Sequence, residues 1–301
     1  MTAMCATRMH AGEIETDVAL VRRLLAGQFP HWAGLRVDPV ASYGTDHDIY
    51  RLGDRLAVRL PRIGWATRQA AKEATWLPRL APHLPLALPV PLAMGYPADG
   101  YPFDWSVYTW LPGANANGTI GDLEQAAVDL AGFVTALRRI DTTGAHPRPP
   151  GGRGGPLAEH DEQVRRSIAA LGDRIDGAAA LRSWQESLDT PPWDGPEVWV
   201  HGDLLPGNLL VVGGRLSAVI DFGCLNVGDP ACDLQPAWYM FAGDSRRRFR
   251  AELDVDDASW SRGRGWALQA VSALTYYRDT NPGMVRQASH ALRQVLADSS
   301  R

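Results

Sequence analysis

The stretch that decides the fold is Val198-Trp199-Val200-His201-Gly202-Asp203-Leu204-Leu205-Pro206-Gly207-Asn208, followed by Leu216-Ser217-Ala218-Val219-Ile220-Asp221-Phe222-Gly223. Two short apolar runs rich in β-branched residues, at 198–200 and 216–220, predict buried strands, and Gly213-Gly214 between them predicts a hairpin-type turn. The polar side chains begin where these strands end. We therefore expect Asp203, Asn208 and Asp221 to converge on one cavity.

The spacing of these three side chains, H-x-D-x-x-x-x-N followed by D-F-G, is the spacing that holds magnesium and a hydroxyl nucleophile in phosphoryl transfer. Magnesium prefers oxygen ligands and usually takes only one or two carboxylates together with substrate phosphates. The pattern predicts Asp203 as the catalytic base, and Asn208 and Asp221 as magnesium ligands. The simpler interpretation is that the two acids only cap turns.

With these residues the chain resembles the aminoglycoside phosphotransferase family, small-molecule antibiotic kinases with a protein-kinase-like fold. It has His201-Gly202-Asp203 where protein kinases have H-R-D, and Gly228-Asp229-Pro230-Ala231-Cys232-Asp233-Leu234 follows D-F-G. The long activation segment of a regulated protein kinase is missing. The resemblance implies an α+β fold of two lobes: a small antiparallel-sheet lobe that binds nucleotide (1–112) and a larger, mainly helical lobe for catalysis and acceptor binding (113–301).

In the first lobe, apolar alternation predicts three short strands at 35–41, 48–52 and 55–60, with Gly53-Asp54 as a turn. The loop between the first two strands lacks a complete G-x-G-x-x-G. The resemblance implies that this loop covers the ATP phosphates, with Ser42, Gly44 and Thr45 as donors to phosphate oxygens. An ordinary hairpin turn is the alternative.

The third strand places Arg59 where the kinase V-A-I-K strand has lysine, and arginine can hold phosphate through a planar fork. A helix predicted over 67–77 carries Glu73, the candidate partner of Arg59. A solvated surface pair is the alternative for both charges. A further strand over 104–110 ends at a turn, where the resemblance implies that backbone groups near Trp110 and Leu111 meet the adenine edge.

Helical periodicity predicts the remaining elements, and a Pro/Gly tract over 145–156 predicts an irregular, mobile loop that could border the acceptor site. Thr16 is the expected cap of a helix that reaches Leu25. The other helices are expected at 121–140, 157–171, 178–188, 232–241, 245–252, 258–277 and 284–297.

Composition places the chain among ordinary globular proteins, with 301 residues, 45% hydrophobic and 21% charged. The net charge of −4 offers no overall basic footprint for nucleic acid. No secretory h-region and no run of about 18 apolar residues is present, so we expect no membrane partner and a cytoplasmic protein. The three cysteines form no C-x-x-C pair and fit reduced thiols.

These patterns predict an O-phosphotransferase that moves the γ-phosphoryl group of ATP, with GTP as an alternative donor, to a hydroxyl of a small molecule, using Mg²⁺. The resemblance implies an antibiotic such as an aminoglycoside or a macrolide as the acceptor. A metabolite kinase and a nucleotide-binding pseudokinase are the alternatives, the latter because Arg59 departs from the usual lysine. The oligomeric state is left open.

Two sets of side chains are acceptor candidates. The acids Glu252, Asp254, Asp256 and Asp257 would suit an amine-rich acceptor. The aromatics Trp238, Tyr239, Trp260, Trp266, Tyr276 and Tyr277 would suit an apolar or sugar ring face. A solvated turn and core packing explain the same residues equally well.

Overall fold

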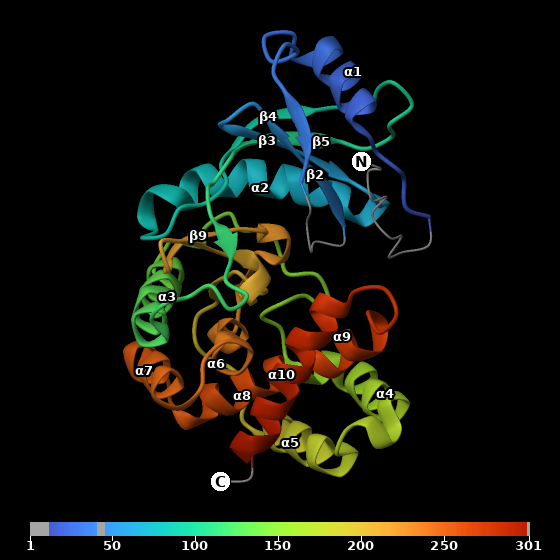
Figure 1. Ribbon diagram of the computed structural model, residues 1–301. Coiled ribbons are helices and arrows are strands. Elements are labelled where there is room, and N and C mark those ends of the chain that lie inside the picture. Colours follow the sequence, from blue (N-terminus) through green and yellow to red (C-terminus); the bar gives the residue numbers. More distant parts are fainter. Residues whose placement is uncertain (1–11, 41–45, 300–301) are drawn as a thin grey trace. The chain divides into compact units, whose positions relative to one another are not determined.

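The computed structural model describes residues 12–40 and 46–299 and divides the chain into two compact units (Figure 1). The first unit comprises Met1–Pro82 and Ala87–Pro112, and the second comprises His83–Leu86 and Gly113–Arg301. The first is built around an antiparallel sheet and the second is mainly helical, which confirms the predicted α+β class. The assignment of nucleotide binding to 1–112 and of catalysis to 113–301 stays a prediction.

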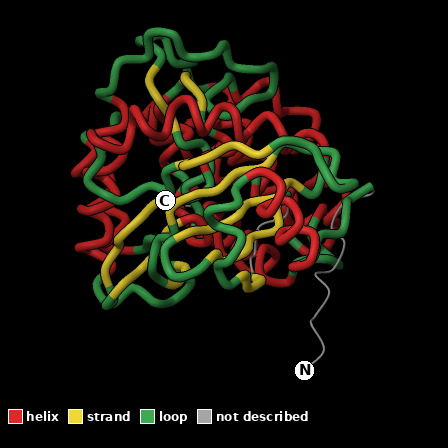
Figure 2. Tube along the Cα trace, turned by 90° about the horizontal axis from the view of Figure 1, so that it is seen from above, coloured by secondary structure: helices red, strands yellow, loops and turns green. Residues whose placement is uncertain are grey.

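The first unit is a five-stranded antiparallel sheet with two helices, and its strands run side by side in Figure 2. The strand order is β1-β2-β3-β5-β4, so β4, which begins with Pro91, lies at an edge, where a missing N–H is tolerated. The elements are α1 (Val18–Gln28), β1 (Val37–Pro39), β2 (His47–Leu52), β3 (Leu56–Pro61), α2 (Thr67–Leu80), β4 (Pro91–Gly95) and β5 (Trp105–Thr109).

The two faces of this sheet have different environments. Val58 and Leu60 of β3 are fully buried in a core that also contains Leu24 and Leu25 of α1. Because side chains alternate along a strand, Arg59 points to the opposite face, where α2 lies. Because of this alternation, the Arg59 side chain contacts α2 and lies outside the apolar core.

The second unit contains most of the helices and two small sheets. Its elements are β6 (Ala114–Asn115), α3 (Leu123–Arg138), α4 (Asp161–Leu171), α5 (Gly177–Asp189), β7 (Val198–Val200), β8 (Leu209–Val212), β9 (Arg215–Val219), β10 (Asn226–Gly228), α6 (Pro236–Tyr239), α7 (Gly243–Leu253), α8 (Asp257–Leu268), α9 (Ala270–Tyr276) and α10 (Pro282–Ser299).

The hairpin that supports the predicted catalytic residues is formed by β8 and β9. Gly213 and Gly214 at its turn have φ values of 58° and 80°, the positive pair that a type I′ turn requires. The turn lies where the sequence predicts it, whereas β8 was not expected. The apolar run at 209–212 directly before the two glycines was the available signal. β7 pairs instead with β10 in a separate two-stranded sheet.

Three local expectations were wrong. The helix α1 is capped by Asp17, whose carboxylate accepts from the Leu20 N–H at 2.6 Å, while the Thr16 hydroxyl donates to Asp48. The single helix expected at 232–241 is a 3₁₀ segment (Pro230–Leu234) followed by one α turn, because Pro236 has no N–H to continue the first segment. The helix expected at 258–277 is divided at Gln269 into α8 and α9.

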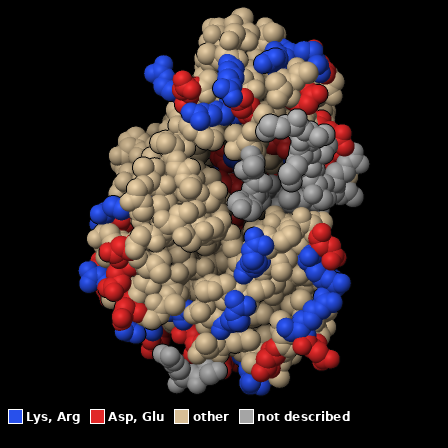
Figure 3. All heavy atoms as spheres, viewed as in Figure 1, with Lys and Arg blue, Asp and Glu red and all other residues tan. Residues whose placement is uncertain are grey.

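No helix among the described residues is long and apolar enough to cross a membrane. On the face shown in Figure 3, acidic and basic side chains of the described residues are interspersed and do not gather by sign.

Candidate active site

In the first unit, Arg59 and Glu73 form the ion pair that the sequence predicts. One guanidinium nitrogen of Arg59 donates to both carboxylate oxygens of Glu73, each at 2.8 Å. The Glu73 side chain is only 1% exposed and that of Arg59 is 14% exposed. The alternative of a solvated surface pair is therefore wrong for these two residues.

Two further side chains of the first unit contact this pair, and the sequence analysis overlooked both. The Tyr108 hydroxyl donates to Glu73, and the second terminal nitrogen of Arg59 lies 3.3 Å from Nδ1 of His47. Burial, and secondarily the Glu73 carboxylate, raise the pKa of Tyr108, so its hydroxyl stays protonated and able to donate. Alternation along the strand at 104–110 was the available signal for Tyr108, which follows Ser106 on the face of β5 opposite Val107.

The other residues predicted to bind nucleotide are a loop, Ser42, Gly44 and Thr45, and a strand end, Trp110 and Leu111. Ser42, Gly44 and Thr45 lie outside the described residues. The Trp110 N–H donates to the carbonyl oxygen of Arg55 at 2.8 Å and is therefore used within the fold. An adenine contact at this position would have to use other backbone groups of Trp110 and Leu111.

In the second unit, a buried carboxylate shapes the segment 201–208, which we call the catalytic loop. Asp233 is fully buried and accepts from the backbone N–H groups of His201 and Gly202, both at 2.8 Å. His201 Nδ1 accepts from the Asp203 N–H, and Nε2 donates to the Ile220 carbonyl oxygen at 3.1 Å. This arrangement requires a neutral imidazole protonated at Nε2, so His201 supports the loop.

The loop brings Asp203 and Asn208 together. Asn208 Nδ2 donates to the Asp203 carboxylate at 2.8 Å and to its carbonyl oxygen at 2.9 Å. Burial raises the pKa of Asp203, while the Arg153 guanidinium acts in the opposite direction and Asp221 adds to the rise. A raised pKa suits a carboxylate that must accept a proton.

Asp221 lies just after β9 and has a backbone conformation that is uncommon for residues other than glycine. Its φ and ψ are 62° and 71°, in the left-handed region. The N–H of Ile220, the preceding residue, donates to the Asn208 carbonyl oxygen at 2.9 Å and ties the catalytic loop to this strand end. Such strain persists only where the surroundings impose it and is frequent at functional sites.

Arg153, from the loop at 145–156, reaches Asp203 and was overlooked in the sequence. A terminal guanidinium nitrogen lies 3.8 Å from the Asp203 carboxylate, and the two side chains are 27% and 25% exposed. The arginine lies within a Pro/Gly tract that has no periodicity, so the sequence carries no local signal for this contact. The contact joins two residues that are 50 positions apart in the chain.

The acids of the segment after D-F-G have structural roles. Asp229 accepts from Arg262 Nε at 2.7 Å and from the Ala231 N–H at 2.9 Å. Asp229 N–H in turn donates to the Gly154 carbonyl oxygen at 2.8 Å, which anchors the 145–156 loop next to Arg153. Asp229 thus holds the loop, and Asp233 holds the backbone at His201 and Gly202.

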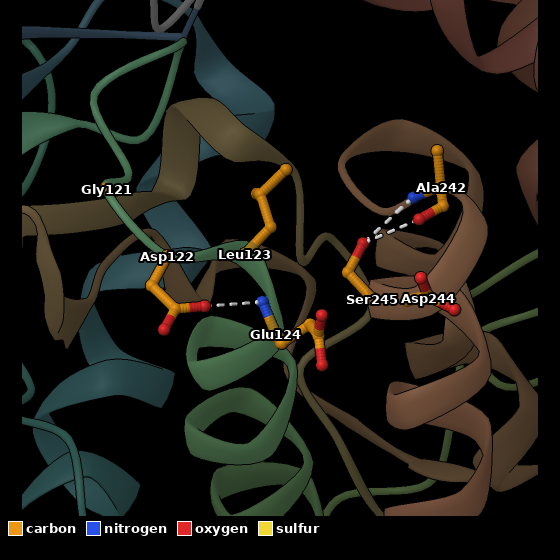
Figure 4. Close-up of a pocket in the computed structure, with 7 residues that line it drawn as sticks. All are labelled: Gly121, Asp122, Leu123, Glu124, Ala242, Asp244 and Ser245. Carbon is orange, nitrogen blue, oxygen red and sulfur yellow. Dashed lines mark hydrogen bonds between the residues drawn. The ribbon is translucent and has the colours of Figure 1, made fainter.

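A surface hollow of about 480 Å³ lies elsewhere in the second unit, between the N-terminal ends of α3 and α7 (Figure 4). Asp122 there caps α3, the Ser245 hydroxyl bonds the Ala242 backbone at the start of α7, and Asp244 pairs with Arg247. None of the predicted catalytic, metal or nucleotide residues lines it. We assign it no part in the chemistry.

Comparison with known proteins identifies the family. A family model described as the phosphotransferase enzyme family, APH, matches residues 40–266, which is more than half of the chain. The chain belongs to this phosphotransferase family. The predicted enzyme class, a phosphotransferase with an alcohol group as acceptor, is confirmed at the level of the family.

Solved structures show that the phosphotransferase shares its fold with antibiotic kinases. The GDP and kanamycin complex of APH(2")-IIIa is 19% identical with a TM-score of 0.71, over 93% of this chain and 99% of that one. The macrolide 2'-phosphotransferase MphH from Brachybacterium faecium is 23% identical with a TM-score of 0.60, over 92% and 97%. The streptomycin-ATP complex of APH(2")-IIa is 16% identical with a TM-score of 0.58, over 93% and 97%. A search of curated proteins found no match.

The acceptor candidates named from the sequence are mostly used within the phosphotransferase fold. Glu252 and Asp257 pair with arginines, Asp256 caps α8, and Asp254 ends α7. Trp238 and Trp266 are almost fully buried, at 0% and 1% exposure. The structural interpretation therefore explains the acids and the two buried tryptophans, whereas Tyr276 is 56% exposed.

Gly202 provides a test of how tightly the catalytic loop is packed. Its φ is +81°, and a Cβ atom there would come within 2.7 Å of Arg153 Cβ and 2.9 Å of the Cys224 carbonyl oxygen. We expect Gly202→Ala to lower the free energy of unfolding by about 1–3 kcal/mol, measured by urea denaturation. Gly132→Ala is the control, because Gly132 lies in α3 with open space around its Cα; it should be neutral or stabilising by up to about 1 kcal/mol. Equal effects would contradict the packing argument.

Proposed function

We propose that this protein transfers the γ-phosphoryl group of ATP or GTP to a hydroxyl of a small molecule, with aminoglycoside and macrolide antibiotics as the first acceptors to test. The observation that carries the proposal is the position of the Asp203 carboxylate. It accepts from Asn208, and Asp233 holds the backbone of the same loop at His201. The fold shared with enzymes whose structures contain GDP, ATP and antibiotics supports the choice of substrates.

A kinase of a small metabolite would use the same groups. A cytoplasmic location, expected from the sequence, stays a prediction.

In the proposed reaction, Asp203 accepts the proton of the acceptor hydroxyl. The hydroxyl oxygen forms a bond to the γ-phosphorus, and the bond from that phosphorus to the bridging oxygen of the β-phosphate breaks. The products are a phosphate ester, a nucleoside diphosphate and a proton on the carboxylate. General-base assistance of this type is worth about 10²–10⁴ in rate.

Asn208 and Asp221 fit a magnesium site because both side chains carry oxygen atoms, the ligands that Mg²⁺ prefers. Because Asn208 Nδ2 is turned to Asp203, its Oδ1 remains as a hard ligand, and Asp221 supplies a carboxylate. Among the described residues no group of three His, Cys, Asp or Glu side chains is placed to hold a metal. A site of two protein ligands is typical of magnesium that is also bound by substrate phosphates. When bound, the ion would neutralise phosphate charge.

In the first unit we assign Arg59 to the non-transferred phosphates, with Glu73 holding its side chain. The loop residues Ser42, Gly44 and Thr45 are proposed as phosphate donors, and the backbone at Trp110 and Leu111 as the adenine contact. Arginine keeps the positive charge of the usual lysine and adds a fork of donors. The buried partner of Arg59 supports this assignment, because a cation with a buried carboxylate beside it keeps a defined position.

The experiment that tests the proposal is a coupled nucleotide-turnover screen with Mg²⁺ against aminoglycosides, macrolides, peptide antibiotics and small metabolites. Acceptor-dependent release of nucleoside diphosphate, with phosphate found on the acceptor by mass spectrometry, is the expected result. Tight nucleotide binding without turnover on any acceptor would favour a pseudokinase, for which the exchange of lysine for Arg59 is the supporting observation.

The magnesium assignment predicts a specific phenotype for Asp221→Asn. Asparagine keeps one oxygen ligand and removes the charge, and charge-assisted contacts are worth about 1.5–3 kcal/mol. We expect the Mg²⁺ concentration for half-maximal turnover to rise about ten- to a hundredfold, measured by titrating Mg²⁺ at fixed nucleotide. Asp173→Asn, in a 3₁₀ turn away from the catalytic loop, is the control. An unchanged Mg²⁺ requirement in Asp221→Asn would remove this residue from the metal site.

A further inference from the structure

The loop at 145–156 holds a cation against the predicted catalytic base. Arg153 lies 3.8 Å from the Asp203 carboxylate and remains 27% exposed, so a molecule that brings a hydroxyl to Asp203 also meets this guanidinium. Asp203 is the carboxylate that acts on the Arg153 guanidinium, and the Cys224 and Cys232 thiols and the Tyr239 phenol also lie near it. An acceptor hydroxyl at Asp203 therefore meets the charges of Asp203 and Asp221, and Arg153 is the cation beside them.

Arg153 is fixed by its surroundings on several sides. One guanidinium nitrogen donates to the Gln269 side-chain oxygen at 3.3 Å, and the guanidinium lies 5.6 Å from the Trp266 ring centroid. Its Cβ packs against Gly202, and the neighbouring Gly154 carbonyl accepts from the Asp229 N–H. The loop expected to be mobile is therefore anchored by hydrogen bonds at this point, and the arginine cannot simply turn away into solvent.

The residues around Arg153 have hydrogen-bonding capacity that the fold does not use. Among the described residues, Trp266 Nε1, Gln269 Nε2 and His160 Nε2 are buried atoms without a hydrogen-bond partner. His160 contacts the Trp266 ring edge to face, with 5.1 Å between centroids. Burial, together with Arg153, lowers the pKa of His160, so its ring is neutral near pH 7. The group is rich in N–H donors, and its carboxylates are Asp203 beside Arg153 and Glu159 beside His160, the latter already accepting from Arg148 and the Gly151 N–H.

We propose that Arg153 is a specificity-determining residue that selects acceptors whose reactive hydroxyl is flanked by neutral or oxygen-rich groups and disfavours those with an ammonium group beside it. This inference rests on the proposed function and narrows its acceptor class. A guanidinium offers only donors, which match hydroxyl, carbonyl and carboxylate oxygens. An ammonium group in the same place would meet a like charge, and such juxtapositions discriminate between ligands.

The test uses pairs of probes that carry the same scaffold and differ in charge: kanamycin and gentamicin, each as the free amine and in the fully N-acetylated form. Binding to the nucleotide-loaded protein is measured by calorimetry, and turnover by release of nucleoside diphosphate. Wild type is compared with Arg153→Gln, which removes the charge and keeps an amide. Arg165→Gln is the matched control, because Arg165 lies on α4 and also donates to a glutamine oxygen, that of Gln185.

For wild type we expect the N-acetylated form to bind about tenfold or more tightly than the free amine. Arg153→Gln should reduce this preference about tenfold, and Arg165→Gln should leave it unchanged. A wild-type preference for the free amine, a preference that Arg153→Gln does not alter, or failure of every N-acetylated form to bind would each overturn the inference. In the second case Arg153 only balances the charge of Asp203.

The two proposals fail in distinguishable ways. Turnover that favours free amines contradicts the role of Arg153 and leaves the phosphotransfer reaction standing. Binding that follows the expected charge preference, without phosphate appearing on any acceptor, contradicts the proposed function and leaves the assignment of Arg153 standing.

Discussion

Asp203→Asn is expected to lower acceptor-dependent turnover by about 10²–10⁴ while leaving nucleotide affinity close to that of the wild type. Asparagine has the size of aspartate and can still meet Asn208, but it cannot accept the hydroxyl proton. Because the catalytic loop is held by Asp233 and His201, which the substitution does not touch, the backbone should keep its course. The measurement is steady-state kinetics beside nucleotide binding by calorimetry.

A matched aspartate separates this effect from a general loss of charge. Asp256→Asn replaces the N-cap of α8, where asparagine caps as well as aspartate, so turnover and stability should change little. If Asp203→Asn retains near-normal turnover, Asp203 is not the base. If it loses nucleotide binding to the same degree as turnover, the carboxylate is needed for the shape of the loop and not for the chemical step.

The second large effect is expected at Arg59. In Arg59→Ala the Glu73 carboxylate, 1% exposed, loses its cation and remains buried, and removing one partner of a buried pair typically costs about 3–5 kcal/mol. If Arg59 also holds the phosphates, nucleotide use should fall by about one to two orders of magnitude, since charge-assisted bonds are worth about 1.5–3 kcal/mol. Urea denaturation and nucleotide titration measure the two effects separately.

Three further variants decide what Arg59 does. Arg59→Lys keeps the charge without the fork, so partial activity is expected. The double replacement of Arg59 and Glu73 by alanine should lower the free energy of unfolding by less than the sum of the two single losses, because the pair acts as a unit.

Arg248→Ala is the control. Its side chain is 53% exposed and pairs with Glu252 on α7, so we expect the free energy of unfolding to fall by about 0.3–0.5 kcal/mol. Unchanged nucleotide affinity in Arg59→Ala would mean that another cation faces the phosphates.

Features that depend on local periodicity and on short spacing could be predicted from the sequence alone. Alternation along β3 sends Val58 and Leu60 into the core and Arg59 to the face of α2, and the position of Glu73 on that helix completes the pair. The short spacing in H-G-D-x-x-x-x-N places Asn208 against Asp203 within one loop. These features follow from backbone geometry that repeats over a few residues, so they can be read without knowing how distant segments meet.

Contacts between segments far apart in the chain could not be predicted from the sequence and are seen in the folded protein. Asp233 supports the backbone of His201, which is 32 residues earlier, and Arg153 reaches Asp203 from a tract of prolines and glycines without any periodic pattern. The division of one expected helix at Gln269, whose side chain accepts from Arg153, has the same origin. Such contacts depend on how loops close and which buried polar groups must find partners, and these conditions are satisfied by the whole fold and not by neighbouring residues.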